Sequence, residues 1–362
     1  MNILHTETLY NWGGEQNKVL REMMMERELG HNVMLFANPN SIIGQRAQEM
    51  GFKVIYCVMN KKDYLKSIPM LYKTIKENNI VFVFSHGSTD SWNVAICRSI
   101  FRILGNKKIQ FMRERHNLYP IKGFASKFMH KKMFDKILYL SESVRDYLKE
   151  IGLKDSQLFY TPTVVDTKNL CAIKSAFREE FEIPQDALVI GTFTSLYRKK
   201  GVYDFANAAK EALKTYSDAY IVFAGKIKEN VKSEILNLFK KKDKVIFTDF
   251  REDSVNIIKS FDIYVFASHS EGLGTVLLEA MCSKTPIVVY DIAPMNLLVK
   301  NKERGLCAKY LDDKDLAKKI LEMLEDKESA QMYAKNALDF VCENYDLVRL
   351  KEALKELLKE GN

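Results

Sequence analysis

The chain has 362 residues, of which 47% are apolar and 28% charged, and its formal net charge is +8. This composition is globular rather than disordered or fibrous, and the length suffices for two domains that each bury a core. The apolar runs are too short to span a bilayer and the first residues lack a basic, cleavable leader, so we expect a soluble cytoplasmic protein.

Strand-like apolar runs alternate with amphipathic segments along the whole chain. In the first half the strand-like runs span residues 1–5, 33–37, 53–57, 80–85, 109–114 and 137–141, with helical periodicity over 14–29 and 67–77. The pattern restarts after residue 180, with strand-like runs over 188–195, 219–225, 244–249, 263–268 and 286–291. Strands alternating with helices predict a doubly wound parallel sheet, and the restart predicts two of them.

The expected fold class is therefore α/β, with two Rossmann-like domains. Residues 1–170 form the first domain and residues 180–344 the second, and the stretch 161–185, with a turn signal at each end, links them. The amphipathic end of the chain, about 345–362, is expected to pack back on the first domain. Such sheets bind ligands in the crevice outside their strand ends, so we expect a central cleft between the domains.

Positive charge is concentrated in one part of the first domain. Residues 98–136 contain eleven Lys or Arg and two Asp or Glu. The ligands that suit such a surface are nucleic acid, anionic lipid or a phosphorylated substrate, and no nucleic-acid motif accompanies the charge. The six cysteines stand singly, which predicts free thiols rather than a disulfide framework or a zinc site.

Three loops at predicted strand ends carry unusual residues. Gly13 and Gly14 precede the first helix, where they either allow close approach to a phosphate or form an ordinary tight turn. His116 ends a strand beside three charged residues, which favours a pocket over a simply packed imidazole. Arg198 and Lys200, before a glycine, form either a clamp for a diphosphate or a solvated run of charge.

A fourth loop joins the run 263–268 to a helix. Gly272 and Gly274 let the backbone approach a ligand, and the free amides at the helix start attract an anion. Glu271 precedes this turn, and Glu279 lies about one turn into the helix. The simpler alternative is that Glu271 is a helix-entry acid and Glu279 a solvated side chain.

Together these features resemble a family 4 retaining glycosyltransferase of the GT-B fold, over nearly the whole chain. The pair Glu271 and Glu279, with seven residues between them, matches the family's E-x7-E signature. The other matching stretches are "WGGEQ", "ELGHNV", "VFVFSHGS", "RERH", "LYLSESVRDYL", "RKKGV", "IVFAGK" and "RGLCA". Each stretch alone is weak, and the combination is specific.

The resemblance implies a role for each matching residue. Glu279 is expected to bind the ribose hydroxyls of a nucleotide, Glu271 to face the transferred sugar, and His116 to approach that sugar from the other domain. The implied catalytic set is His116, Glu271, Arg198 and Lys200, and the implied donor-binding set is Gly13, Gly14, Gly272, Leu273, Gly274, Thr275 and Glu279. Fixed cations and amides replace a metal at the leaving diphosphate, so neither a metal nor another cofactor is expected.

Three positions depart from the family pattern. Ser195 stands where many members have arginine, and "TVVD" at 163–166 replaces the common "NGVD". The loop 291–298 lacks the usual acid and has Asn296 and Leu297 in its place.

The resulting hypothesis is a hexosyltransferase that moves a sugar from a nucleotide sugar to a glycan acceptor, in surface polysaccharide or lipopolysaccharide assembly. A nucleotide-sugar epimerase and a non-catalytic nucleotide-sugar binder of the same fold are the alternatives. A nicotinamide dehydrogenase is disfavoured, because no G-x-G-x-x-G follows a predicted strand.

The acceptor is expected to be lipid-linked because of the segment 122–136. Its apolar residues Phe124, Phe128 and Met129 fall near one helical face, with Lys127, Lys131 and Lys132 around them. This is an interfacial pattern, which predicts peripheral attachment to the anionic inner face of a membrane. The alternative is a helix that docks its apolar stripe on its own core.

Overall fold

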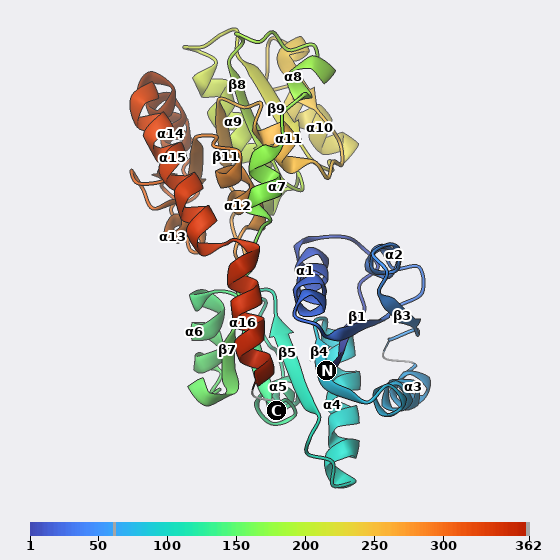
Figure 1. The fold of residues 1–362 in the computed structure, drawn as a ribbon. Helices are drawn as coiled ribbons and strands as arrows, with labels where there is room; N and C mark the ends of the chain where they lie inside the picture. Colours follow the sequence, from blue (N-terminus) through green and yellow to red (C-terminus); the bar gives the residue numbers. More distant parts are fainter. Residues whose placement is uncertain (61–62, 360–362) are drawn as a thin grey trace. The chain divides into compact units, whose positions relative to one another are not determined.

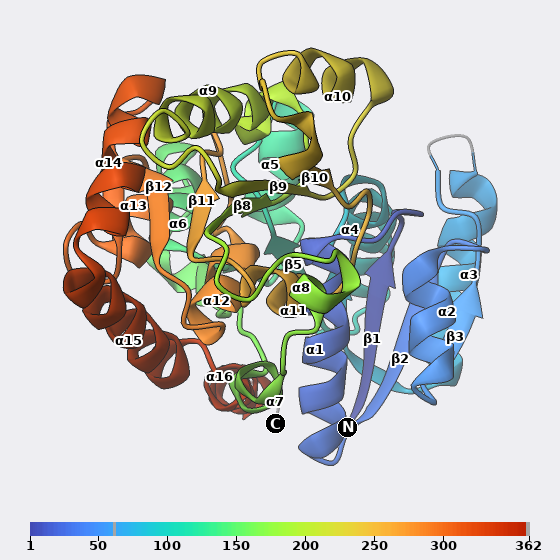
Figure 2. The same ribbon diagram turned by 90° about the horizontal axis from the view of Figure 1, so that it is seen from above.

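The computed structural model describes residues 1–60 and 63–359, which form two compact units. Unit 1 is Met1–Val164 together with Leu347–Asn362, and unit 2 is Val165–Asp346. Each unit contains one β-sheet with helices on both faces (Figures 1 and 2).

Unit 1 holds a seven-stranded parallel sheet in the order β3-β2-β1-β4-β5-β6-β7. Its strands are β1 (Asn2–Glu7), β2 (Asn32–Ala37), β3 (Lys53–Tyr56), β4 (Ile80–Ser85), β5 (Gln110–Arg115), β6 (Lys136–Tyr139) and β7 (Leu158–Tyr160). Its helices are α1 (Gly14–Glu28), α2 (Ile42–Glu49), α3 (Tyr64–Glu77), α4 (Ser88–Ile103), α5 (Phe124–Lys132), α6 (Glu142–Glu150), the short η1 (Asp155–Gln157) and α16 (Leu347–Lys359).

Alternating side chains of these strands supply two cores, one on each face of the sheet. In β1, Ile3 packs with residues of α1, α2 and α16, whereas its neighbour Leu4 packs with residues of α3, α4 and α6. Because side chains alternate along a strand and both faces are covered, strands such as β4 have long apolar runs, whereas β1 and β5 become polar toward their carboxyl ends. Helix α16, at the end of the chain, packs against α1 (Figure 1).

Unit 2 holds a six-stranded parallel sheet in the order β10-β9-β8-β11-β12-β13. Its strands are β8 (Val189–Phe193), β9 (Tyr220–Ala224), β10 (Val245–Phe247), β11 (Ile263–Phe266), β12 (Ile287–Tyr290) and β13 (Leu306–Ala308). Its helices are α7 (Thr167–Ala172), α8 (Phe177–Glu180), η2 (Arg198–Lys200), α9 (Val202–Ala212), α10 (Glu229–Leu236), η3 (Lys242–Lys244), α11 (Ser254–Ile258), α12 (Thr275–Cys282), α13 (Met295–Val299), α14 (Asp313–Glu325) and α15 (Lys327–Asn344).

The core of unit 2 lies between the sheet and the helices α9 and α14. Ile190, Ile263 and Val265 of the central strands pack there with Phe205 of α9 and Ile320 of α14. Helices α11 and α12 lie on the opposite side of the sheet (Figure 2). Helix α12, which carries Glu279, therefore lies on the face of the sheet that is opposite to α9 and α14.

In each sheet the strand order reverses at one point. β1 pairs with both β2 and β4, and β8 pairs with both β9 and β11. Loops that follow such strands diverge and open a crevice at the carboxyl edge, which is where parallel α/β sheets bind ligands. The candidate site residues of unit 2 follow β8 and β11, and those of unit 1 follow β1, β4 and β5.

The predicted α/β architecture with two parallel sheets is confirmed, and each predicted strand-like run overlaps an observed strand. Strands β7 and β13, of three residues each, were not predicted. The stretch 161–185, predicted as a linker, contains the short helices α7 and α8. Among the described residues, no helix combines the length and the apolar character needed to cross a membrane.

Candidate active site

Two loops of unit 2 touch each other where β8 and β11 end. Gly201 has a φ of 70°, and a Cβ at this position would lie 1.8 Å from the carbonyl oxygen of Ala267. The amide of His269 donates to the carbonyl oxygen of Lys199, at 3.0 Å. Glycine at 201 is therefore required for this close approach, which brings the "RKKG" loop against the start of the glutamate motif.

Lys200 and Glu271 meet at this junction. The Lys200 ammonium lies 2.5 Å from Oε1 of Glu271, and the two side chains are 22% and 13% exposed. The pair keeps a cation and a carboxylate at the carboxyl edge of the sheet without sealing them from solvent. The structure thus brings together two of the four predicted catalytic residues.

The glycine loop and helix α12 follow directly. Gly274 caps α12 with a φ of 83°, a conformation that favours glycine, and Thr275 begins the helix. Leu273 is buried and anchors the loop. The predicted strand, glycine turn and helix are confirmed by this arrangement, in which an eight-residue helix begins shortly after Glu271, the partner of Lys200.

Glu279 lies on α12 and is oriented by a neighbouring helix. The hydroxyl of Ser254, the first residue of α11, donates to Oε2 of Glu279 at 2.5 Å. Burial and the negative charges of Glu271 and Glu279 raise the pKa of Tyr264, whose hydroxyl donates to the carbonyl oxygen of Phe193. The phenol of Tyr264, on β11, thus links that strand to the end of β8.

The other predicted clamp residue, Arg198, is placed differently. Its side chain is exposed, and its guanidinium lies 4.7 Å from the ring centroid of Tyr203, over α9. Ser195 is exposed as well. In the loop after β12, Asn296 donates to Asp291 at 2.9 Å while Leu297 is 61% exposed.

Two residues of this site were not predicted from the sequence. His269 Nε2 lies 2.5 Å from Oδ2 of Asp204, and its ring packs edge-on against Tyr310. Ser254, which orients Glu279, is the second. Their partners are distant in sequence, so only the position of His269 beside the glutamate motif could have drawn attention to it.

In unit 1, Gly13 and Gly14 form the entry to α1. Gly13 has extended backbone with a φ of −171°, which any residue can adopt, and its carbonyl oxygen accepts from the amide of Asn17. The backbone itself therefore does not require glycine at position 13.

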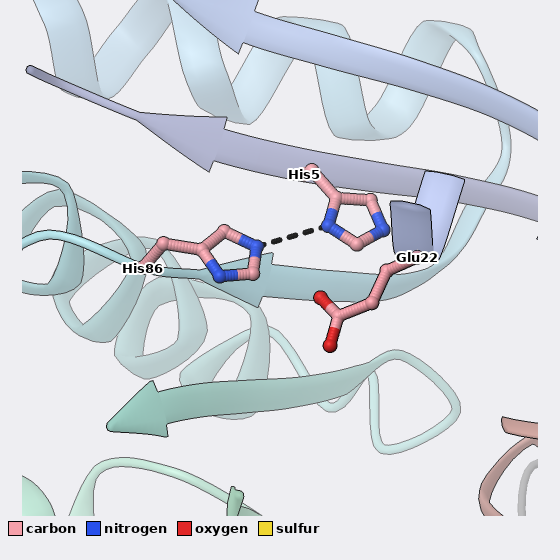
Figure 3. Close-up of side chains that lie close together, drawn as sticks. All are labelled: His5, Glu22 and His86. Carbon is pink, nitrogen blue, oxygen red and sulfur yellow. Dashed lines mark hydrogen bonds between the residues drawn. The ribbon is translucent and has the colours of Figure 1, made fainter. Parts of the chain in front are cut away.

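His116 stands at the end of a buried hydrogen-bonded chain. Its Nε2 lies 3.1 Å from Nδ1 of His86, and Nε2 of His86 lies 2.9 Å from Nδ1 of His5. Nε2 of His5 in turn lies 2.8 Å from a carboxylate oxygen of Glu26. Figure 3 shows the His5 and His86 rings with the Glu22 carboxylate beside them. This series of hydrogen bonds begins at the fully buried Glu26 and fixes the orientation of the His116 ring.

Burial lowers the pKa of His86 to about 4 and holds the pKa of His116 well below its usual range, so both imidazoles are neutral at neutral pH. Burial alone would raise the pKa of Glu114, but the Lys18 ammonium and the neighbouring histidines hold it well below its usual range. Because Nε2 of His116 is engaged by His86, Nδ1 of the neutral ring is left to make one hydrogen bond to a sugar hydroxyl, as donor or acceptor according to its tautomer.

Two groups of side chains here have the composition of a metal site. They are His5, Glu22 and His86, and His86, Glu114 and His116, with each group's ligand atoms within 4.8 Å of one another. The ammonium of Lys18 contacts the carboxylates of both Glu22 and Glu114. A resident lysine thus already supplies positive charge between these carboxylates.

The three apolar residues of α5 that were predicted to share one face lie in different surroundings. Met129 is buried in the unit 1 core, whereas Phe124 and Phe128 are 85% and 48% exposed, with their ring centroids 6.4 Å apart. The prediction that all three share one face is therefore wrong, because Met129 serves as the core anchor. Among the surrounding lysines, Lys127 and Lys132 are exposed and Lys131 is half-buried.

Residues 173–340 match the family of glycosyl transferases group 1. The chain is 22% identical over 293 residues to the O-antigen biosynthesis glycosyltransferase WclY of Escherichia coli, covering 76% of this chain and 80% of that protein. It is 26% identical over 329 residues to the N,N'-diacetylbacillosaminyl-diphospho-undecaprenol alpha-1,3-N-acetylgalactosaminyltransferase of Campylobacter jejuni, covering 83% of this chain and 84% of that protein.

Solved structures share the fold along the whole chain. A glycosyltransferase from Rickettsia africae superposes with a TM-score of 0.88 at 18% identity, over 99% of this chain and 98% of that chain. HepE of Anabaena, in complex with UDP and glucose, gives a TM-score of 0.86 at 16% identity, over 99% of this chain and all of that chain. The chain thus has the two-sheet GT-B fold of these solved glycosyltransferases, and the region that matches the glycosyl transferases group 1 lies in unit 2.

Proposed function

We propose that this glycosyltransferase is a retaining enzyme of family 4 that moves a hexose from a nucleotide sugar to a lipid-linked glycan during surface polysaccharide assembly. The observation that carries the proposal is the grouping of Lys200, Glu271 and the glycine loop before α12, with Glu279 one turn further on. The names of relatives support the acceptor class: one acts in O-antigen biosynthesis and another on a diphospho-undecaprenol-linked sugar. HepE was solved with UDP and glucose, which supports a nucleotide-sugar donor.

Unit 2 supplies the donor half of the proposed reaction. Glu279, oriented by Ser254, accepts hydrogen bonds from the ribose hydroxyls, and the diphosphate lies at the start of α12 beside Lys200. Glu271 faces the sugar and holds the Lys200 ammonium in place. As the bond from the anomeric carbon to the diphosphate breaks, Lys200 and the helix amides stabilise the negative charge that develops on the leaving oxygen.

The new glycosidic bond forms on the face from which the diphosphate leaves, and the departing phosphate oxygen takes the proton of the acceptor hydroxyl. The atoms balance without a metal: the products are the glycoside and the protonated nucleoside diphosphate. His116 contributes a neutral imidazole to a sugar hydroxyl, with its ring held by His86. Because a lysine and helix amides provide the positive potential, we propose that transfer is independent of divalent cations.

The acceptor half is assigned to unit 1, and helix α5 is proposed to rest on an anionic membrane. Phe124 and Phe128 present apolar area to solvent, and Lys127 and Lys132 flank them. Exposed aromatic rings among lysines are the pattern of a helix that lies in the headgroup region of a bilayer.

Thermal-shift measurements with a panel of nucleoside diphosphates and nucleotide sugars test the donor assignment. A ligand present at one hundred times its Kd adds about 2.7 kcal/mol of stability, so one base should raise the melting temperature clearly above the others. If no member of the panel stabilises the protein, the proposed donor class is wrong.

A further inference from the structure

A pocket of about 320 Å³ opens in unit 1 between the loop after β5 and helix α5. Its lining includes Arg113 and Arg115 from β5, Ser126 and His130 from α5, and Glu15 from α1. The volume falls within the range of small-ligand sites, and the combination of apolar walls with convergent polar groups is typical of them.

The polar atoms in this lining are unusual because several of them are not hydrogen-bonded. Among the described residues, Nε of Arg113, Nε of Arg115, Nε2 of His130 and Oε1 of Glu15 are buried without a hydrogen bond. The two arginines and His130 are at least nine-tenths buried. Buried polar atoms are nearly always satisfied, so this concentration in one pocket indicates a polar ligand.

These unsatisfied atoms specify the ligand's chemistry. Nδ1 of His130 donates to the carbonyl oxygen of Ser126 at 2.8 Å, and burial lowers the pKa of His130 to about 3, so Nε2 is a hydrogen-bond acceptor. Arg115 retains its charge, because its pKa, although lowered by burial, is about 10. One terminal nitrogen of each arginine already donates to backbone carbonyl oxygens, so the Nε–H groups are the unpaired cationic donors for an oxyanion, and Nε2 of His130 is an acceptor for a hydroxyl.

Charge in the pocket favours an anion. Arg113, Arg115 and the exposed Lys122 face it, and Glu15 is the acid among the lining residues. Burial, with Glu7 next to it, raises the pKa of Glu15 to about 9, so this carboxyl is protonated at neutral pH and can itself donate or accept.

The pocket also adjoins an apolar surface. Ser126, Met129 and His130 of α5 line it, and the same helix exposes Phe124 and Phe128. We infer that the pocket binds the sugar-phosphate end of a lipid-linked acceptor, with the lipid leaving along the exposed aromatic rings of α5. This inference rests on the proposed function, and it names the group that unit 1 recognises.

Binding of small fragments tests the inference. The chain has two tryptophans, so a Trp12→Phe background leaves Trp92, which lines the pocket, as the fluorescent reporter. The probes are a set of hexose 1-phosphates, the corresponding free hexoses and inorganic phosphate. One hexose 1-phosphate should bind at least about tenfold more tightly than its free hexose and than phosphate alone, because it satisfies both the cations and the hydroxyl acceptor.

Variants locate the site. Arg115→Gln should weaken hexose 1-phosphate binding at least about tenfold, and Lys122→Gln, which removes an exposed charge, should weaken it to a smaller degree. Lys107→Gln, at another exposed lysine that does not line the pocket, is the matched control and should change nothing. If the glutamine variant does not fold, Arg115→Lys replaces it, because lysine keeps the positive charge but lacks the planar set of guanidinium N–H donors.

The outcomes separate the pocket from the proposed function. Equal affinity for hexoses and their phosphates, or unchanged binding in folded Arg115 and Lys122 variants, would overturn the inference even if nucleotides bind unit 2. Phosphate that binds as tightly as the hexose 1-phosphates would reduce the pocket to a simple anion site and would also overturn it. Tight, Arg115-dependent binding of a hexose 1-phosphate without any binding of nucleotides would support the assignment of the pocket and contradict the proposed transferase function.

Discussion

Replacing Glu279 by alanine is the substitution that addresses the donor site most specifically. The Glu279 carboxylate is held by the Ser254 hydroxyl at 2.5 Å, so it is preorganised to accept from a ribose. A hydrogen bond to a charged group is worth about 1.5 to 3 kcal/mol, so removing one such bond to the ribose should weaken nucleotide binding roughly tenfold to a hundredfold. Alanine is a good helix former, so α12 should persist in the variant.

Titration calorimetry with the preferred nucleoside diphosphate measures this change in affinity. Ser254→Ala, which keeps the carboxylate and removes only its orienting hydroxyl, should cost about 1 kcal/mol, or roughly fivefold in Kd. Glu271→Gln should lower transfer more than it changes nucleoside diphosphate affinity, because we assign Glu271 to the sugar and its contact with the diphosphate is only indirect, through Lys200. Unchanged affinity in a folded Glu279→Ala protein would refute the ribose role.

Three further predictions concern charge, pH and the membrane. Transfer should continue in excess chelator, because Lys200 and the α12 amides supply the positive potential; activity that chelation abolishes and magnesium or manganese restores would contradict this. The native state holds the Glu15 proton with a pKa of about 9 against 4.5 in the unfolded chain, so this group should make the free energy of unfolding fall by about 1.4 kcal/mol per pH unit between about pH 5 and 8. Glu15→Gln should remove that slope in chemical denaturation, and parallel pH profiles for the two proteins would show that Glu15 is ionised. The double variant Phe124→Ala, Phe128→Ala should weaken salt-sensitive co-sedimentation with anionic vesicles. Ile103→Ala, which removes an exposed apolar side chain of α4, should not weaken it. Equal binding by the wild type and both variants would show that α5 does not contact the membrane.

The two sheets were predictable because their strands are buried on both faces and leave long apolar runs between helical periods. The strand, glycine turn and helix around Glu271 were predictable as well, because glycines and the helical spacing are local signals. The approach of Lys200 to Glu271 depends on the packing of Gly201 against Ala267, which joins residues far apart in the chain. Such contacts leave no periodic pattern in a single sequence.

The polar interior of unit 1 was not predicted, for the same reason. His5, His86 and His116 lie on different strands or the loops after them, and only the parallel pairing of β1, β4 and β5 lines them up. The misplacement of Met129 has another cause: helical spacing places residues on a circle, but it does not state which arc faces the core. That arc is visible only in the exposed fractions of Phe124 and Phe128.

The configuration of the product tests the central claim most directly. The enzyme is incubated with its stabilising nucleotide sugar, carrying an α-linked hexose, and a polyprenyl diphosphate-linked sugar as acceptor, and the new linkage is assigned by NMR from the anomeric proton. We predict transfer of the hexose with its α configuration kept and with release of one nucleoside diphosphate for each glycoside formed. A β-linked product would contradict the retaining mechanism, and the absence of transfer from every stabilising nucleotide sugar would contradict the assignment as an active transferase of this acceptor class.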